Sequence, residues 1–259
     1  MANTVYNNKV IEAKAKDLLT TAVNTRNLMS VDTTLSQEAG MTKTINVYTY
    51  SGTAEEVAAG KGNTNRGAIT YVPNDYTVKM VQQAFDYQDE DFMKDNTIVD
   101  NMLKGANQVM VNKMAEDFTT ELAKATLSID GVAALGYDAI VDAISKLNIE
   151  DESKLFVVIP NVAKGDLRKD EDYKAARMGE VIYNGQVGTV AGIPVVATKA
   201  LDGAAYVMSA DAVKLFMKKD IEVEQERDAD TRTNSVYLRT AYICALVDNT
   251  QICKIPLAE

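Results

Sequence analysis

Residues 43–87 decide the fold, reading KTINVYTY (43–50), SGTAEEVAAGKGNTNRG (51–67) and AITYVPNDYTVKMVQQAFDY (68–87). The outer two segments alternate apolar and polar side chains with the two-residue period of a β-strand. The middle segment holds four glycines among small and charged residues, a composition typical of a mobile loop tip. The sequence therefore predicts a long β-hairpin with a mobile end.

The length of this hairpin limits where it can lie. A strand of some 20 residues, at about 3.3 Å per residue, spans roughly 60 Å, which exceeds the radius of a small domain. An isolated two-stranded hairpin is only marginally stable in water. We therefore expect it to lie on a neighbouring subunit. The alternative is two ordinary strands of a central sheet with a disordered connection.

The segments on either side of the hairpin have helical periodicity. On the N-terminal side, a short amphipathic helix is predicted at residues 8–24 and an extended arm at 29–41. On the C-terminal side, residues 96–126 carry an apolar stripe from Ile98 to Ala125 that includes Val109, with no proline. At about 1.5 Å per residue this stripe predicts an unbroken helix of about 45 Å.

The rest of the chain reads as an α/β layer followed by antiparallel strands. Helices are predicted at 137–148, 163–167 and 210–217, and strands at 154–159, 192–198 and 204–208. From residue 220 onward, the strands 221–226, 236–247 and 251–255 are expected to pair antiparallel through short turns such as 248–250.

The composition excludes several classes of function. The 259-residue chain has no histidine and no tryptophan, which removes most hydrolytic triads and zinc sites. Its net charge of -10 would repel a phosphate backbone, so a dedicated nucleic-acid reader is not expected, although local contacts with DNA remain open.

Cys244 and Cys253 lack the spacing of a redox or metal pair and are expected to be reduced thiols. Without a signal peptide or an apolar run long enough to span a membrane, the chain is expected to be cytosolic.

Three short motifs contain residue types that also occur in ligand-binding or catalytic sites. Gly60-Lys61-Gly62 lacks the other residues of a phosphate loop, and Asp228 with Asp230 lacks the remaining ligands of a calcium loop. Glu222, Glu224 and Glu226 share one strand face, which favours a solvated or inter-subunit surface. No catalytic, cofactor-binding or metal site is predicted.

The order of these elements, with two local segments, resembles a known family. The segments are Gly188–Thr198 (GTVAGIPVVAT) and Phe216–Glu224 (FMKKDIEVE). Over nearly the whole chain, the pattern is similar to the Hong-Kong-97-type major capsid proteins of tailed double-stranded DNA phages. The resemblance implies an α+β fold with an N-terminal arm (1–42), an extended loop hairpin (43–90), a spine helix of the peripheral domain (91–130), an α/β axial domain (131–218) and C-terminal strands completing the peripheral domain (219–259).

The resemblance also implies two groups of inter-subunit contacts. The first, on the tip of the extended loop, is Thr53, Glu55, Glu56, Lys61 and Arg66. The second, in an axial-domain loop near a ring centre, is Arg168, Lys169, Asp170, Glu171, Asp172 and Arg177. Mixed charges of this kind can pair between copies around a ring. A solvated surface loop is the alternative for the second group.

By the same resemblance the chain is structural and not an enzyme. It is expected to form hexamers and pentamers of itself that close an icosahedral shell around phage DNA, without sequence-specific binding, cofactor or membrane contact. Only residues 1–42 precede the hairpin, so scaffolding is expected to be a separate protein, unless the chain is already processed. A portal and decoration proteins are further expected partners, with assembly in the host bacterial cytoplasm and a final location in the virion capsid. The alternatives are an encapsulin shell around a cargo enzyme and a soluble α/β enzyme.

Overall fold

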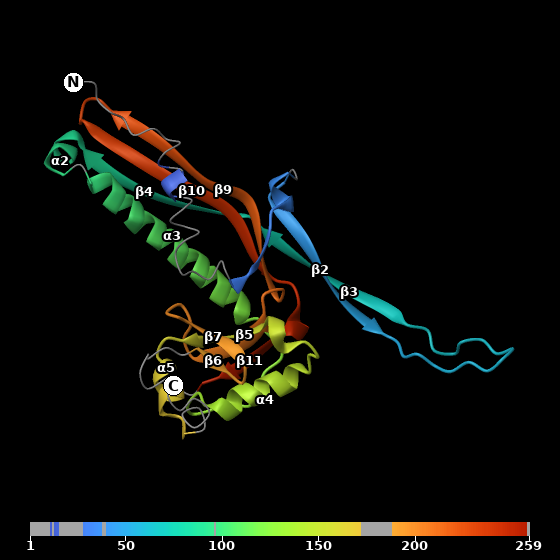
Figure 1. Cartoon of the computed structure of the whole chain (residues 1–259). Helices are drawn as coiled ribbons and strands as arrows, with labels where there is room; N and C mark the ends of the chain where they lie inside the picture. The colour runs from blue at the N-terminus through green and yellow to red at the C-terminus, as the bar shows by residue number, and fades with distance from the viewer. Residues whose placement is uncertain are drawn as a thin grey trace.

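The computed structural model describes residues 11, 13–15, 28–37, 40–95, 97–171 and 188–257. An elongated sheet lies along helix α3, a second sheet with two shorter helices lies at one end of α3, and a two-stranded ribbon projects from the region between them (Figure 1). The predicted helix at 8–24 lies mostly outside the described residues, although Ile11 and residues 13–15 are helical.

The elongated sheet has the strand order β1-β9-β10-β4. β10 pairs antiparallel with both β9 and β4, and β1 adds a short parallel edge to β9. One face of the sheet packs on α3, where side chains such as Val236 and Leu238 meet Leu103 and Met110 in one apolar cluster. The strands are β1 (Ser30–Asp32), β4 (Lys79–Gln88), β9 (Val213–Asp228) and β10 (Thr233–Leu246).

Helix α3 (Ile98–Leu122) confirms the predicted long helix. It follows the short helix α2 (Asp89–Lys94), and the Asp95 carboxylate accepts hydrogen bonds from the backbone N–H of Thr97 (2.8 Å) and its hydroxyl (2.7 Å) just before α3 begins. The prediction was wrong for Val109, which is 51% exposed because it faces away from the sheet. Among the described residues, no helix is both long enough and apolar enough to cross a membrane.

The second sheet has the order β11-β8-β5-β7-β6, and its central strand β5 is buried throughout. Helix α4 packs on it, with Ile140 and Ile144 in the same apolar cluster as Val157 and Val207. The elements are α4 (Tyr137–Leu147), β5 (Leu155–Pro160), α5 (Lys164–Lys169), β6 (Thr189–Val190), β7 (Ile193–Thr198), β8 (Ala204–Ser209) and β11 (Ile252–Pro256). Short 3-10 turns are found at η2 (Thr34–Ser36), η3 (Glu152–Lys154) and η4 (Asn249–Gln251).

The ribbon consists of β2 (Thr42–Ser51) and β3 (Ala68–Thr77). These strands pair over their full length, from Thr42 opposite Thr77 to Ser51 opposite Ala68. The predicted second strand of the hairpin, 68–87, was wrong at its C-terminal end. The chain changes partner at Val78, and β4 then joins the elongated sheet beside β10.

The helix predicted at 210–217 is also wrong, since β9 begins at Val213. Leu215 and Met217 pack toward α3, whereas Phe216 packs on the opposite face of the sheet. A strand buried on both faces is an unbroken apolar run, which does not distinguish strand from helix by its periodicity.

The expected pairing of the last strand was wrong as well. After β10, the Asp248 carboxylate accepts from the backbone N–H of Thr250 (2.9 Å) in the turn at η4, and β11 then pairs antiparallel with β8 in the second sheet. The C-terminal residues 252–256 therefore lie with the strands that the resemblance assigns to the axial domain. The domain boundaries as a whole stay predictions.

Candidate assembly interface

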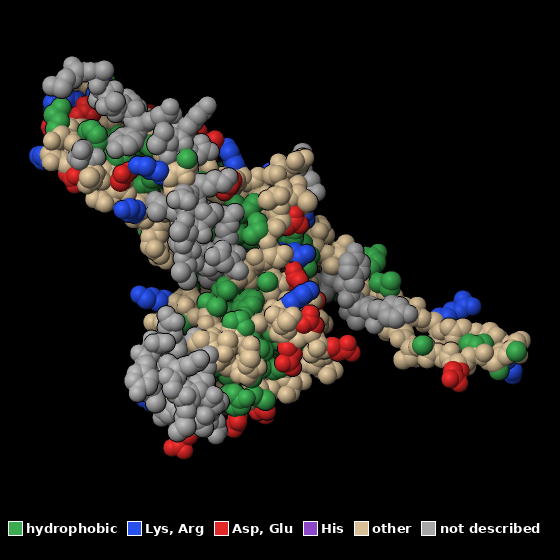
Figure 2. Space-filling view, viewed as in Figure 1, with side chains coloured by type: hydrophobic (Ala, Val, Ile, Leu, Met, Phe, Trp, Pro, Cys, Tyr) green, Lys and Arg blue, Asp and Glu red, His purple; other side chains and the backbone are tan. Residues whose placement is uncertain are grey.

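The ribbon formed by β2 and β3 carries large apolar side chains that its own chain leaves uncovered. Ile69 is 64% exposed, Tyr71 62% and Val72 58%. Because side chains alternate along a strand, Ile69 and Tyr71 share one face and Val72 lies on the other. The ribbon stands clear of the rest of the surface (Figure 2). Exposed apolar patches of this kind mark protein–protein contacts.

The base of the ribbon is packed instead. Ile45 and Val78 are buried against Phe216 and Ile243 of the elongated sheet, together with Leu35 from the segment before the ribbon. The Lys43 ammonium lies 4.5 Å from the centre of the Phe216 ring, within cation–π range. Among the described residues, these packing contacts of the ribbon with its own subunit lie at its base.

Thr53 and Glu55, two of the predicted contact residues, close the tip of the loop within their own chain. The Glu55 carboxylate accepts from the backbone N–H groups of Thr64 and of Asn65 (3.2 Å) and from the Thr64 hydroxyl (2.7 Å). The Asn65 amide donates to the hydroxyl and the carbonyl (3.1 Å) of Thr53. These hydrogen bonds lower the pKa of Glu55, because they stabilise its charged form.

The other three predicted tip residues, Glu56, Lys61 and Arg66, are exposed. A turn forms here, in which the backbone N–H of Lys61 donates to the carbonyl of Ala58 (3.0 Å) and Gly60 takes a φ of 81°. Such a φ favours glycine. The tip therefore presents charged side chains at the far end of the ribbon, and their contacts with another subunit stay a prediction.

The second predicted group lies far from the ribbon tip, at and after α5 (Figure 1). Arg168 and Lys169 are in the last turn of α5, and the exposed Glu171 follows it. Asp172 and Arg177 lie outside the described residues. The described members of the two predicted groups therefore lie apart within one subunit.

Asp170 has a structural role in its own chain. Its Oδ2 accepts the backbone N–H of Tyr137 at 2.6 Å, at the first residue of α4. A Cβ on Gly136 would lie 2.7 Å from the same oxygen, so the absence of a side chain at Gly136 allows this approach. A carboxylate at a helix N-terminus is favourable because it meets unpaired N–H groups and the positive end of the helix dipole.

The three glutamates of β9 are placed as expected on a solvated face, and two of them have partners. Glu222 pairs with Lys219 (2.5 Å), and Glu224 pairs with Arg239 of β10 (2.6 Å). Exposed pairs of this kind contribute little stability.

Sequence reasoning missed two features. The apolar side chains of β3 predict a strand, but their exposure was not predicted. The sequence shows more apolar residues in β3 than a central sheet would bury, and this was the available signal. Asp117 and Glu121 of α3 are buried, and they were passed over because the helix was read from its apolar residues. Their spacing of four residues puts both on the same face as Met114 and Phe118, which was the available signal.

Comparison with known proteins agrees with this geometry. No protein-family model matches the sequence. The major capsid protein of Staphylococcus phage phiMR11 is 29% identical over 243 residues, covering 87% of this chain and 84% of that protein.

Solved structures extend the likeness to the fold. The capsid of the cyanophage P-SCSP1u matches with a TM-score of 0.68 at 14% identity, over 90% of this chain and 87% of that one. A structure from Mycobacterium phage Che8 matches with a TM-score of 0.63 at 16% identity, over 82% and 84%. A virus-like particle from Pyrococcus furiosus matches with a TM-score of 0.67 at 10% identity, over 97% and 100%. The chain is thus similar in sequence to a phage major capsid protein, and it shares the α+β fold of the solved phage capsids, as the resemblance to the Hong-Kong-97-type family predicted.

Proposed function

We propose that many copies of this chain assemble through hexameric and pentameric rings into an icosahedral shell around phage genomic DNA. The observation that carries this proposal is the ribbon, which is packed at its base and leaves the apolar side chains of Ile69 and Val72 exposed. A second copy of the chain supplies the missing surface. Obligate interfaces of this kind bury on the order of 2,000 Å² or more, so the stability of the shell comes from many repeated contacts.

The proposed partners follow from the same role. A separate scaffolding protein would guide the curvature of the shell, and a portal and decoration proteins would complete it. The net charge of -10 suits a wall that encloses DNA without binding it tightly. Assembly would take place in the host bacterial cytoplasm, and the virion capsid is the final location.

A cavity of about 450 Å³ between α3 and the end of β7 bears on the enzyme alternative. Polar side chains around it are paired within α3, since Gln108 donates to Asn112 (3.0 Å) and Lys113 pairs with Glu116 (2.9 Å). Across the ranges that the structure describes, no cluster of Cys, Asp and Glu side chains is suited to hold a metal ion. This cavity gives the enzyme alternative no support.

Electron microscopy of the full chain, expressed alone and with its phage's scaffolding protein, tests the proposal. We expect closed shells in at least one of the two preparations. A chain that stays monomeric or dimeric in both would contradict the proposal. The contents of purified shells distinguish a phage capsid from an encapsulin. Nucleic acid supports a phage capsid, and a protein cargo supports an encapsulin.

A further inference from the structure

The ribbon leaves the elongated sheet at a single residue. The last pair of the ribbon is Thr42 with Thr77, and the next residue, Val78, donates its N–H to the carbonyl of Met41 (2.7 Å). The β4–β10 ladder then begins with Lys79 opposite Tyr242. The direction of the ribbon is therefore set by whatever holds Val78 and the Lys79–Tyr242 pair.

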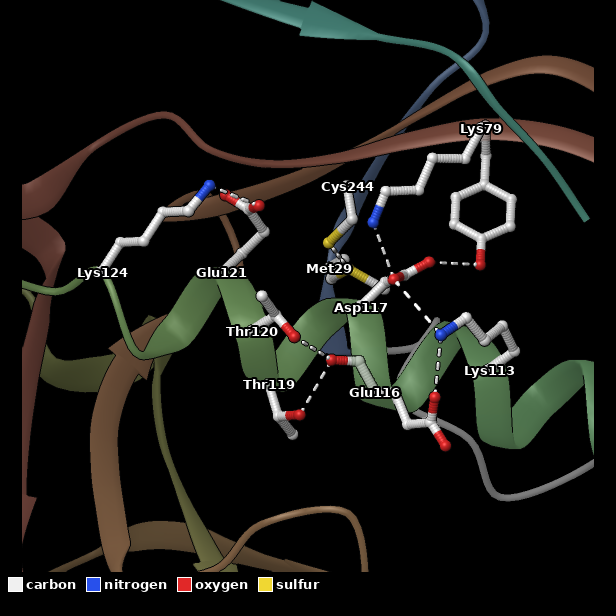
Figure 3. Close-up of polar contacts among 11 residues, drawn as sticks. Met29, Lys79, Lys113, Glu116, Asp117, Thr119, Thr120, Glu121, Lys124 and Cys244 are labelled. Carbon is white, nitrogen blue, oxygen red and sulfur yellow. Dashed lines mark hydrogen bonds and ion pairs between the residues drawn. The ribbon is translucent and has the colours of Figure 1, made fainter.

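Both side chains of that pair reach the same buried carboxylate on α3. Lys79 Nζ donates to Asp117 Oδ1 at 2.8 Å (Figure 3). The Tyr242 hydroxyl donates to Asp117 Oδ2 at 2.9 Å. Asp117 is only 5% exposed. One side chain thus joins three elements, α3, β4 and β10, at the point where the ribbon departs.

The charges around Asp117 fit a fixed contact. Lys113, one turn earlier on α3, lies 4.0 Å from the same Oδ1 and adds a second positive charge. Burial and the neighbouring Asp117 carboxylate raise the pKa of Tyr242, so its hydroxyl stays protonated as a donor. Hydrogen bonds to a charged group contribute more than neutral ones, and they are costly to break when the group is buried.

A second carboxylate one turn along α3 extends this contact. Glu121 accepts from Lys124 (2.6 Å) through Oε1 and from the backbone N–H of Leu246 (3.4 Å) through Oε2. The Lys124 ammonium also lies 5.4 Å from the centre of the Tyr76 ring, and the Tyr76 hydroxyl donates to the carbonyl of Leu246 (3.4 Å). Asp117 of α3 and Lys124, two residues after α3 ends, therefore contact the chain on either side of Val78, at Lys79 and Tyr76.

We propose that Asp117 is a positioning residue, which fixes the angle at which the β2–β3 ribbon leaves the subunit and so directs it onto a second copy of this chain. This inference rests on the proposed shell function. Val78 is packed on the opposite face of the sheet, against Phe216 and Ile243, and the Asp117 contact prevents the ribbon from pivoting about that apolar packing.

Spin-label distance measurements test the proposal in the full chain. One label is placed at Thr70 on the ribbon and one at Lys104 on α3, both of which are exposed. The native thiols Cys244 and Cys253 are buried, and burial raises their pKa values, so they react slowly with the labelling reagent. Labelled chains are diluted with unlabelled ones, so that distances between subunits do not contribute.

Wild-type protein is expected to give one narrow distance distribution. Asp117→Asn should broaden it and reduce the yield of closed shells, because the loss of charge-assisted hydrogen bonds lowers the population of the held orientation by roughly tenfold to a hundredfold. Tyr242→Phe should have a smaller effect of the same kind. The double variant should broaden the distribution less than the sum of the two single effects.

Two control variants separate positioning from general stability. Asp100→Asn removes another carboxylate of α3, an exposed one that pairs with Lys14 of the N-terminal segment, and Val236→Ala is expected to destabilise the sheet away from the ribbon. Both should leave the distribution narrow. A narrow distribution in Asp117→Asn, or equal broadening in Val236→Ala, would overturn the inference while wild-type shells still form. A wild type that forms no shells would instead contradict the proposed function.

Discussion

The apolar side chains at the base of the ribbon are buried, whereas those in its outer half are exposed. At the base, Ile45 is 8% and Val78 6% exposed, whereas farther out Ile69 is 64% and Val72 58% exposed. All four are β-branched apolar residues with similar strand propensity. Position along the ribbon, and not the local sequence pattern, therefore decides which of these side chains the subunit itself buries.

The outer half is nevertheless ordered by contacts between its strands. β2 and β3 stay paired out to Ser51 opposite Ala68, and Glu55 closes the tip by accepting from the Thr64 hydroxyl at 2.7 Å. A segment that is already structured loses less conformational entropy when it docks. The ribbon is therefore prepared for a partner surface that its own subunit does not provide.

The largest expected effect comes from placing a charge on the outer half. Ile69→Asp should abolish shell formation, as seen by electron microscopy, while the melting temperature of the unassembled subunit stays close to that of the wild type. The reason is that Ile69 is largely exposed in the subunit, so under the proposed assembly a charge there would disturb contacts between copies and little else. Ile69→Val is the matched control and should form shells. Normal shells from Ile69→Asp would contradict this view of the outer half.

A core substitution at the base should act on the subunit itself. Ile45→Ala is expected to lower the free energy of unfolding by about 2 to 4 kcal/mol, because it leaves a cavity among buried side chains. Val72→Ala, in the outer half, should change it by no more than about 0.5 kcal/mol. Chemical denaturation of the unassembled subunit measures both. Equal losses at the two positions would remove the distinction between base and outer half.

The smallest expected effect is local and depends on pH. The pKa of Glu55 is lowered by its hydrogen bonds to Thr64 and Asn65, so the stability from these bonds is present above the ordinary carboxyl pKa and is lost as the pH falls through the lowered value. The NMR amide shifts of Thr64 and Asn65 should therefore titrate with a midpoint below that of an ordinary glutamate carboxyl. In Glu55→Gln this titration should be absent. A midpoint at or above the ordinary glutamate value would show that the tip is open.

Periodicity was enough to predict the ribbon and α3, because each is defined by contacts close in sequence. It failed where a distant partner decides the structure. Nothing in residues 68–87 marks the change of partner at Val78, which depends on β10. The C-terminal strand likewise joins β8 across the molecule.

The candidate site divides in the same way. Glycine composition indicated the loop tip, whereas the roles of Asp170 and Asp117 could not be predicted from local pattern. Asp170 caps a helix that begins 33 residues earlier, and Asp117 accepts from Tyr242, 125 residues later. The spacing of Asp117 could indicate that it is buried, but the remote partner of such a side chain has no signature in one sequence.

The most direct measurement is a cryo-electron microscopy map of the assembled particle at side-chain resolution. The account predicts that the outer half of each β2–β3 ribbon lies on a neighbouring copy, with Ile69 or Val72 buried in that contact. A closed particle in which both side chains stay in solvent, or in which the ribbon folds back onto its own subunit, would contradict it.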